Sequence, residues 1–117
     1  MNDLDHKHLL ISANIDNPPK KVTALNDWLK RLCTIIDMKI ITGPHSVYQD
    51  EEGNRGITGI VGISTSHISI HVWDEPVPAQ VKLDVYSCKP FNIHSVVEHL
   101  RELGLQDIKY KVIDRNF

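Results

Sequence analysis

The chain has 117 residues and a formal net charge of −2, with 13 basic and 15 acidic side chains. This length favours one domain over residues 1–117, and 41% apolar with 24% charged residues is typical of a soluble globular fold. No apolar run approaches the roughly 20 residues of a membrane span, and no basic block indicates nucleic acid as a partner. The polar, acidic start argues against a secretory signal, and the widely spaced Cys33 and Cys88 fit neither a disulfide framework nor a metal pair. We therefore expect a cytoplasmic protein that binds neither membrane nor nucleic acid.

The first half of the chain is predicted to hold two strands, a helix and a loop. Residues 8–14 form a short apolar run typical of a strand. From residue 19 or 20 to 37, apolar side chains recur every three or four positions, as they do along the buried stripe of an amphipathic helix. Residues 38–42 predict a second strand that ends at Gly43-Pro44, and the acidic, glycine-containing stretch 48–55 predicts a loop.

The second half is predicted to hold four strands and one helix. The helix spans 92–103 with Gly104 as its C-cap, and the strands span 57–64, 67–73, 80–87 and 107–113. The resulting order is β-α-β-β-β-β-α-β. This order predicts an α+β two-layer sandwich, in which two helices cover one face of a mainly antiparallel sheet.

Strand alternation predicts an unusual mixture of side chains on the uncovered face of this sheet. In 67–73, one face carries His67, His71 and Trp73, and the neighbouring strands add Thr58 and, if the strand continues, Cys88. Two histidines four positions apart on a strand lie ~13 Å from each other and cannot bind one metal ion. The mixture predicts either a functional site or a partly buried polar dimer interface.

One long stretch of the sequence resembles a known family. The segment GITGIVGISTSHISIHVWDE (56–75), followed by VKLDVYSC (81–88), is similar to the prokaryotic S-adenosylmethionine decarboxylase proenzymes. These are small pyruvoyl enzymes of polyamine (spermidine) biosynthesis. Their pattern is a hydroxyl residue, Gly, an apolar run, Ser-Glu-Ser-His, a second His, Trp-Pro-Glu, and a Cys about twenty residues after the cleavage serine. The similarity is strongest over 56–88 and extends weakly over nearly the whole chain.

The resemblance implies a self-cleaving zymogen. Ser66 matches the serine that becomes the pyruvoyl group, so the chain would be cut between Thr65 and Ser66. Thr58 matches the hydroxyl residue that assists this autocatalytic cleavage, and His71 the histidine that moves protons in it. Cys88 matches the catalytic proton donor.

The resemblance also implies a substrate site and a homodimer. Glu75 matches the acidic residue that contacts the ribose of S-adenosylmethionine, and Trp73 occupies the tryptophan of the same motif. Members of the family are cut into two chains that stay together, and two such pairs form a dimer. No metal and no separate cofactor are implied, because the pyruvoyl group arises from Ser66.

The residue types suit this chemistry. Ser66 Oγ can attack the Thr65 carbonyl and convert the amide into an ester, and elimination and hydrolysis then leave a pyruvoyl group. A hydroxyl such as that of Thr58 stabilises the oxyanion, and the His71 imidazole transfers protons. The ketone forms a Schiff base with the substrate amine and accepts the electrons released with CO₂, and Cys88 returns a proton.

Several departures from the family pattern leave alternatives open. Thr65 replaces the usual Glu, Trp-Asp-Glu replaces Trp-Pro-Glu, and the turn before the last strand of the motif is about two residues longer. The adenine-stacking phenylalanine has no clear match, although Tyr48 is a substitute if its loop folds back. The acidic residues 50–52 suit a cationic substrate, so a pyruvoyl-dependent arginine or ornithine decarboxylase is one alternative. An uncleaved, non-catalytic homologue that binds a ligand or partner is another.

Overall fold

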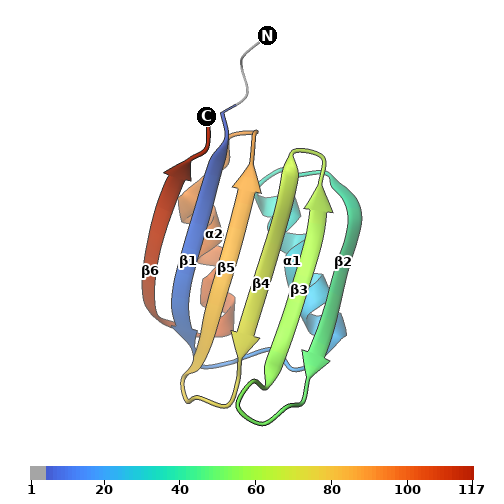
Figure 1. Cartoon of the computed structure of the whole chain (residues 1–117), viewed down its shortest axis with the longest axis vertical. Coiled ribbons are helices and arrows are strands. Elements are labelled where there is room, and N and C mark those ends of the chain that lie inside the picture. The colour runs from blue at the N-terminus through green and yellow to red at the C-terminus, as the bar shows by residue number, and fades with distance from the viewer. Residues whose placement is uncertain (1–4) are drawn as a thin grey trace.

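A computed structural model describes residues 5–117 as one six-stranded antiparallel sheet with two helices on one face (Figure 1). The sheet order is β2-β3-β4-β5-β1-β6, and every neighbouring pair is antiparallel. The predicted α+β sandwich and its element order are confirmed. The elements are β1 Lys7–Ile15, α1 Val22–Ile35, β2 Ile40–Gln49, β3 Gly56–Ile63, β4 Ser66–Trp73, β5 Ala79–Ser87, α2 Ile93–Leu100, a short 3₁₀ turn Arg101–Leu103, and β6 Leu105–Asp114.

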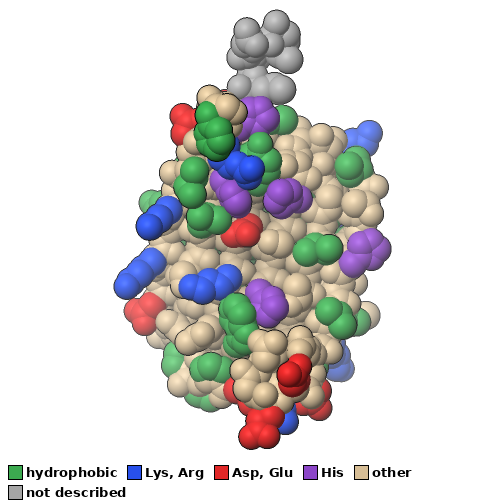
Figure 2. All heavy atoms as spheres, viewed as in Figure 1, with side chains coloured by type: hydrophobic (Ala, Val, Ile, Leu, Met, Phe, Trp, Pro, Cys, Tyr) green, Lys and Arg blue, Asp and Glu red, His purple; other side chains and the backbone are tan. Residues whose placement is uncertain are grey.

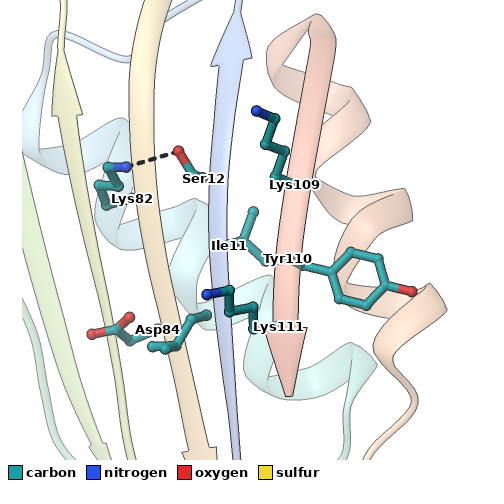
Figure 3. A pocket seen from close by; sticks show the side chains of 8 residues that line it. Ile11, Ser12, Lys82, Asp84, Lys109, Tyr110 and Lys111 are labelled. Carbon is teal, nitrogen blue, oxygen red and sulfur yellow. Dashed lines mark hydrogen bonds between the residues drawn. The ribbon is translucent and has the colours of Figure 1, made fainter. Parts of the chain in front are cut away.

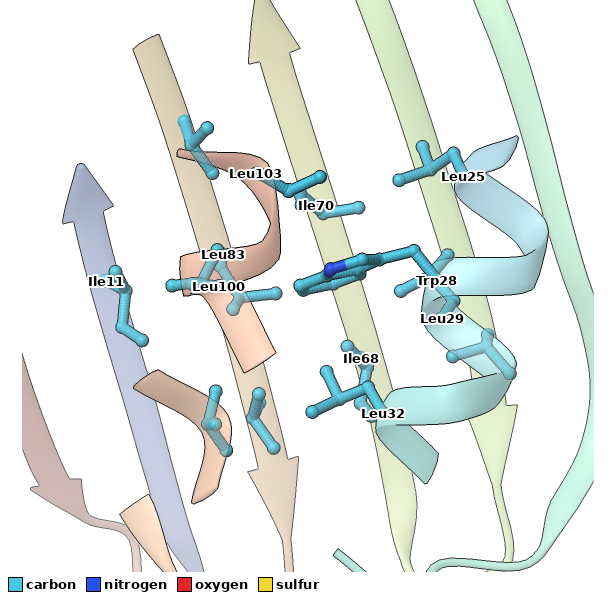
Figure 4. Close-up of a cluster of buried hydrophobic side chains, with 14 of the residues drawn as sticks. Ile11, Leu25, Trp28, Leu29, Leu32, Ile68, Ile70, Leu83, Leu100 and Leu103 are labelled. Carbon is cyan, nitrogen blue, oxygen red and sulfur yellow. The ribbon is translucent and has the colours of Figure 1, made fainter. Parts of the chain in front are cut away.

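The core lies between the sheet and the two helices. Strand alternation places Ile68, Ile70 and Val72 of β4 under the helices, all at most 1% exposed. Trp28 of α1 reaches across the centre of this layer (Figure 4), and its indole Nε1 donates to the His99 carbonyl of α2 at 3.3 Å. Cys33 is also buried, and burial raises the pKa of its thiol to about 11. Trp28 and Cys33 are therefore core residues, as the helix stripe predicts.

Helix α1 lies close to β3 because Gly59 has no side chain. A Cβ added at Gly59 would lie only 2.8 Å from side-chain carbons of Leu25 and Leu29, so a larger residue would push the helix away. The second helix, α2, is N-capped by Asn92, whose side chain accepts a hydrogen bond from the His94 amide at 2.8 Å. The 3₁₀ turn that follows α2 ends at Gly104, which has a φ of 74° and serves as the predicted C-cap.

The prediction for the second strand was wrong in its extent. Strand β2 continues through Gly43-Pro44 to Gln49, with register shifts between Ile40 and His45. β2 is an edge strand, where the missing N–H of proline leaves no ladder hydrogen bond unmade. Tyr48 is consequently a strand residue paired with the buried Ile57, and it packs against the core. It does not fold back toward the uncovered face, so it does not replace the missing phenylalanine there.

The other face of the sheet is not covered by helices. Figure 2 shows this uncovered face, on which histidines, basic residues and hydrophobic side chains are intermixed. Two apolar side chains on it are well exposed, Val47 at 62% and Ile60 at 52%. A shallow hollow of about 310 Å³ crosses β5, β1 and β6, where Lys82 donates to Ser12 at 2.8 Å (Figure 3).

Within residues 5–117, no helix combines the length and the apolar character needed to cross a membrane.

Candidate active site

The predicted cleavage position lies in the tight turn between β3 and β4. Ser64 and Thr65 form the turn, and Ser66 is the first residue of β4, paired with Ile63. Ser66 has a φ of 151°, in a region that residues other than glycine seldom adopt. Such a conformation costs of order 1–3 kcal/mol and persists only where the surrounding structure enforces it. The bond that enters Ser66 is therefore held in a strained backbone.

The Thr65 carbonyl, which belongs to the predicted scissile bond, is hydrogen-bonded to the chain just after β5. The amide N–H of Cys88 donates to this oxygen at 3.1 Å. An N–H aimed at a carbonyl polarises it and stabilises the oxyanion that forms when a nucleophile adds. Cys88 is thus placed beside Thr65 within one chain.

A fully buried hydroxyl supports this arrangement. Ser87 is 0% exposed, and its Oγ donates to the Thr65 hydroxyl at 2.8 Å and accepts from the Lys89 amide at 2.9 Å. The sequence analysis missed this residue. Its signal was present, because Ser87 follows Val81, Leu83 and Val85 on the core-facing side of β5, where a lone hydroxyl is unexpected.

A second group of predicted site residues lies further along the same two strands. Thr58 of β3 and His71 of β4 face each other in register, and Thr58 Oγ1 lies 2.8 Å from His71 Nδ1. The indole of Trp73 lies against the His71 imidazole, with ring centroids 4.2 Å apart. Burial lowers the pKa of His71 below 6.5, so its imidazole is neutral at pH 7 and able to accept a proton.

Glu75 lies in the turn after β4 and is paired with Arg55. The Arg55 guanidinium lies 3.1 Å from one Glu75 oxygen, and the Arg55 amide donates to the other at 3.2 Å. The same guanidinium binds Asp50 at 2.6 Å, and the Trp73 Nε1 donates to Asn54 at 2.8 Å. An open hollow of about 590 Å³ adjoins these groups and is lined by Gly53, Trp73, Glu75, Pro76, Gln80 and Lys82.

The predicted residues therefore form two groups within one chain. Thr65, Ser66 and Cys88 lie at one end of the β3-β4 hairpin, whereas Thr58, His71, Trp73 and Glu75 lie toward the other. Five positions along a strand separate Ser66 from His71, which is roughly 16 Å. In the described part of the chain, no three His, Cys, Asp or Glu side chains are grouped so that they would hold a metal ion.

Comparison with known proteins identifies the family. The sequence model of the S-adenosylmethionine decarboxylase family matches residues 10–116. The S-adenosylmethionine decarboxylase proenzyme of Archaeoglobus fulgidus is 41% identical over 86 residues, which are 69% of this chain and 71% of that protein. The proenzyme of Clostridium botulinum strain Langeland is 32% identical over 77 residues, so the match covers 65% of this chain but only 61% of that relative.

A solved structure shares the fold of this chain. The crystal structure of the adenosylmethionine decarboxylase from Aquifex aeolicus superposes with a TM-score of 0.76 and 24% identity, over 97% of this chain and 92% of that one. The chain belongs to the S-adenosylmethionine decarboxylase family.

Proposed function

We propose that the chain is a pyruvoyl-dependent S-adenosylmethionine decarboxylase of polyamine (spermidine) biosynthesis, which cleaves itself between Thr65 and Ser66. The observation that carries this proposal is the hydrogen bond from the Cys88 amide to the Thr65 carbonyl at 3.1 Å. This N–H is a hydrogen-bond donor for the oxyanion that forms when the Thr65 carbonyl is attacked. The adjoining Ser66 has a φ of 151°, which strains the same peptide. A cytoplasmic location belongs to the same proposal, because Cys88 has to remain a free thiol.

The proposed self-cleavage uses the Ser66 hydroxyl, the Cys88 amide and the pair formed by Thr58 and His71. Ser66 Oγ adds to the Thr65 carbonyl carbon, the Cys88 N–H stabilises the oxyanion, and the Ser66 nitrogen leaves as an amine, so that an ester replaces the amide. His71, held by Thr58, then removes the Ser66 α proton, and the Thr65 carboxylate departs with the C–O bond electrons. Water finally replaces the Ser66 nitrogen, which leaves as ammonia.

The residues around position 66 fit the pyruvoyl group that this reaction would create. The group supplies an electrophilic carbonyl that takes up the electrons released with CO₂. The chain supplies the rest: the buried Ser87 fixes the neighbouring backbone, and Cys88 follows it directly. The Cys88 thiol returns a proton to the substrate carbon that has lost CO₂.

The substrate is held by the second group of residues. Glu75 accepts hydrogen bonds from the hydroxyl groups of the ribose, and the face of Trp73 borders the same 590 Å³ hollow. The carboxylates of Asp50 and Glu75 are both paired with Arg55, which leaves them poorly suited to bind a cationic side chain. The ribose of S-adenosylmethionine is uncharged and needs only hydrogen-bond acceptors, so this pairing favours that substrate over arginine or ornithine, whose side-chain cation would lie beside Arg55.

A second copy of the chain brings the two groups of residues together. We propose a homodimer in which the uncovered sheet faces pack on each other, related by a twofold axis that runs between the two sheets, at right angles to β4 and level with the point between Ile68 and Ser69. Because this point lies midway between Ser66 and His71, the axis places the Thr58 and His71 pair of each copy over Ser66 of the other. The same contact covers the exposed side chains of Val47 and Ile60.

Carboxyl-labelled S-adenosylmethionine, arginine and ornithine, each incubated with the cleaved protein, provide the test. We expect labelled CO₂ from S-adenosylmethionine alone, and we expect Cys88→Ala to cleave itself but to release CO₂ at least tenfold more slowly. Release from arginine or ornithine alone would assign a different substrate to the same machinery. No release from any of the three, together with an uncleaved chain, would favour a non-catalytic binding protein.

A further inference from the structure

His67 directly follows the reacting serine, and the steps assigned to Cys88 and His71 do not use its imidazole. Building on the proposed self-cleavage, we propose that His67 is the base that takes the Ser66 hydroxyl proton in the first step. His71 then serves only the later elimination. Self-cleavage thus uses His67 for the formation of the ester and His71 for the elimination.

The proposal begins with distances along β4. His67 Nδ1 lies 3.4 Å from Ser66 Oγ, within reach of a proton transfer after a small adjustment. His71 of the same chain is roughly 16 Å further along the strand and cannot reach this hydroxyl. The first step therefore has a base within the chain, whatever the second copy contributes.

The environment of His67 holds its ring in place. His67, Tyr86 and His8 lie in one row across β4, β5 and β1, because Tyr86 pairs with both histidines. The His67 ring centroid is 5.5 Å from that of Tyr86 and 6.4 Å from that of His8, both in edge-on arrangements. These aromatic contacts restrict the imidazole, whose side chain is exposed in the single chain.

Tyr86 is itself held by one contact to its hydroxyl and another to the face of its ring. Its hydroxyl lies 2.7 Å from His6 Nδ1, and the Arg115 guanidinium lies 4.2 Å above the ring. His6, just before β1, and Arg115, just after β6, therefore support the ring that supports His67. This support gives the N-terminal and C-terminal segments a role in positioning the base.

The first step converts the amide between Thr65 and Ser66 into an ester. His67 Nδ1 takes the proton of Ser66 Oγ while the oxygen forms a bond to the Thr65 carbonyl carbon. The bond between that carbon and the Ser66 nitrogen breaks, and the protonated His67 gives its proton to the leaving nitrogen. The products are an ester and a free amine, and His67 returns to its neutral form.

The test compares His67→Gln with wild-type protein and with His94→Gln, a control on the exposed side of α2. Each chain is made by cell-free synthesis, and the cleaved fraction is followed by intact mass under denaturing conditions. We expect His67→Gln to cleave at least a hundredfold more slowly, free imidazole to restore part of the rate, and His94→Gln to cleave normally. Urea unfolding midpoints that match the uncleaved Ser66→Ala protein would show that each variant folds.

Hydroxylamine separates the two steps, because it cuts esters much faster than amides. We expect His71→Gln to accumulate a chain that hydroxylamine cuts before residue 66, whereas His67→Gln yields no such chain. Wild-type rates in His67→Gln, or an accumulated ester in that variant, would overturn the proposal while leaving the proposed function intact. A wild-type chain that never cleaves would instead overturn the proposed function and this inference with it.

Discussion

Ser66 combines a strained backbone with a carbonyl neighbour that is already polarised. Its φ of 151° and the 3.1 Å hydrogen bond from the Cys88 amide to Thr65 act on adjacent atoms of one peptide. Addition of the Ser66 hydroxyl to this carbonyl relieves the strain and strengthens the hydrogen bond, because the oxygen becomes an anion. Both effects act on backbone atoms, so a threonine at position 65 is compatible with cleavage.

The strain predicts an unusual stability for a glycine variant. We expect Ser66→Gly and Ser66→Ala to remain uncleaved, with Ser66→Gly more stable by about 1 kcal/mol in urea unfolding. Relief of roughly 1–3 kcal/mol of strain exceeds the roughly 0.5–1 kcal/mol that glycine costs in a strand. If Ser66→Ala is the more stable of the two, the backbone at this position is not strained.

The buried position of His71 predicts a dependence of stability on pH. Because its pKa is lower in the folded protein than the usual 6.5, the unfolded chain binds a proton first as the pH falls. The free energy of unfolding should therefore decrease below about pH 6.5, until the folded-state pKa is reached. We expect Ser66→Ala with His71→Gln to lose less stability between pH 7.5 and 5.5 than Ser66→Ala alone. An equal loss in both proteins would mean that His71 titrates normally.

Among the elements, β4 and β5 were well predicted from the sequence because their alternation has a period of two. Ile68, Ile70 and Val72 fall on the buried face, and His67, His71 and Trp73 on the other. The extent of β2 was not predictable in the same way. A Gly-Pro pair normally ends a strand, because proline has no N–H for the ladder. β2 continues through Gly43-Pro44 only because it lies at the edge of the sheet, which is a property of the whole fold.

The pairing of β3 with β4 depends on Gly56. A Cβ at this residue would lie 1.7 Å from the Val72 carbonyl oxygen, so the two strands would have to separate beside Thr58 and His71. We expect Gly56→Ala, in the Ser66→Ala background, to lose about 3 kcal/mol of stability in urea unfolding.

Gly53→Ala is the matched control for this variant. Gly53 also has a positive φ, of 87°, but nothing lies within 4 Å of its added Cβ. We expect it to lose only about 1 kcal/mol, the usual cost of that backbone conformation. Similar losses in the two variants would show that Gly56 is required for its φ alone and not for the close strand contact.

In the whole molecule, the residues of the sequence motif lie in two separate groups and not in one. The motif suggests one site, since Thr58, Ser66 and His71 lie within fourteen consecutive residues. The hairpin register separates Ser66 from the other two, and this separation depends only on strand geometry. The contact between Cys88 and Thr65 was not predictable, because it requires the pairing of β4 with β5.

The proposed homodimer predicts complementation between two inactive chains. A chain with His71→Ala keeps its own Ser66, and a chain with Ser66→Ala keeps its own His71. If each site combines Ser66 of one copy with His71 of the other, co-expression should allow the His71→Ala chain to be cleaved in mixed dimers. Tags of different mass on the two chains identify which one is cut. Failure to cleave in purified mixed dimers would mean that the two groups do not meet across the interface.

According to the proposed function, the folded chain breaks its own backbone before Ser66 and leaves a carbonyl there. Intact mass under denaturing conditions, measured on freshly folded protein, tests it most directly. We predict two chains, residues 1–65 and 66–117, with the second lacking a free amino terminus and gaining mass on reaction with a hydrazine. A single 13.3 kDa chain after prolonged incubation, with no carbonyl to trap, would contradict the account.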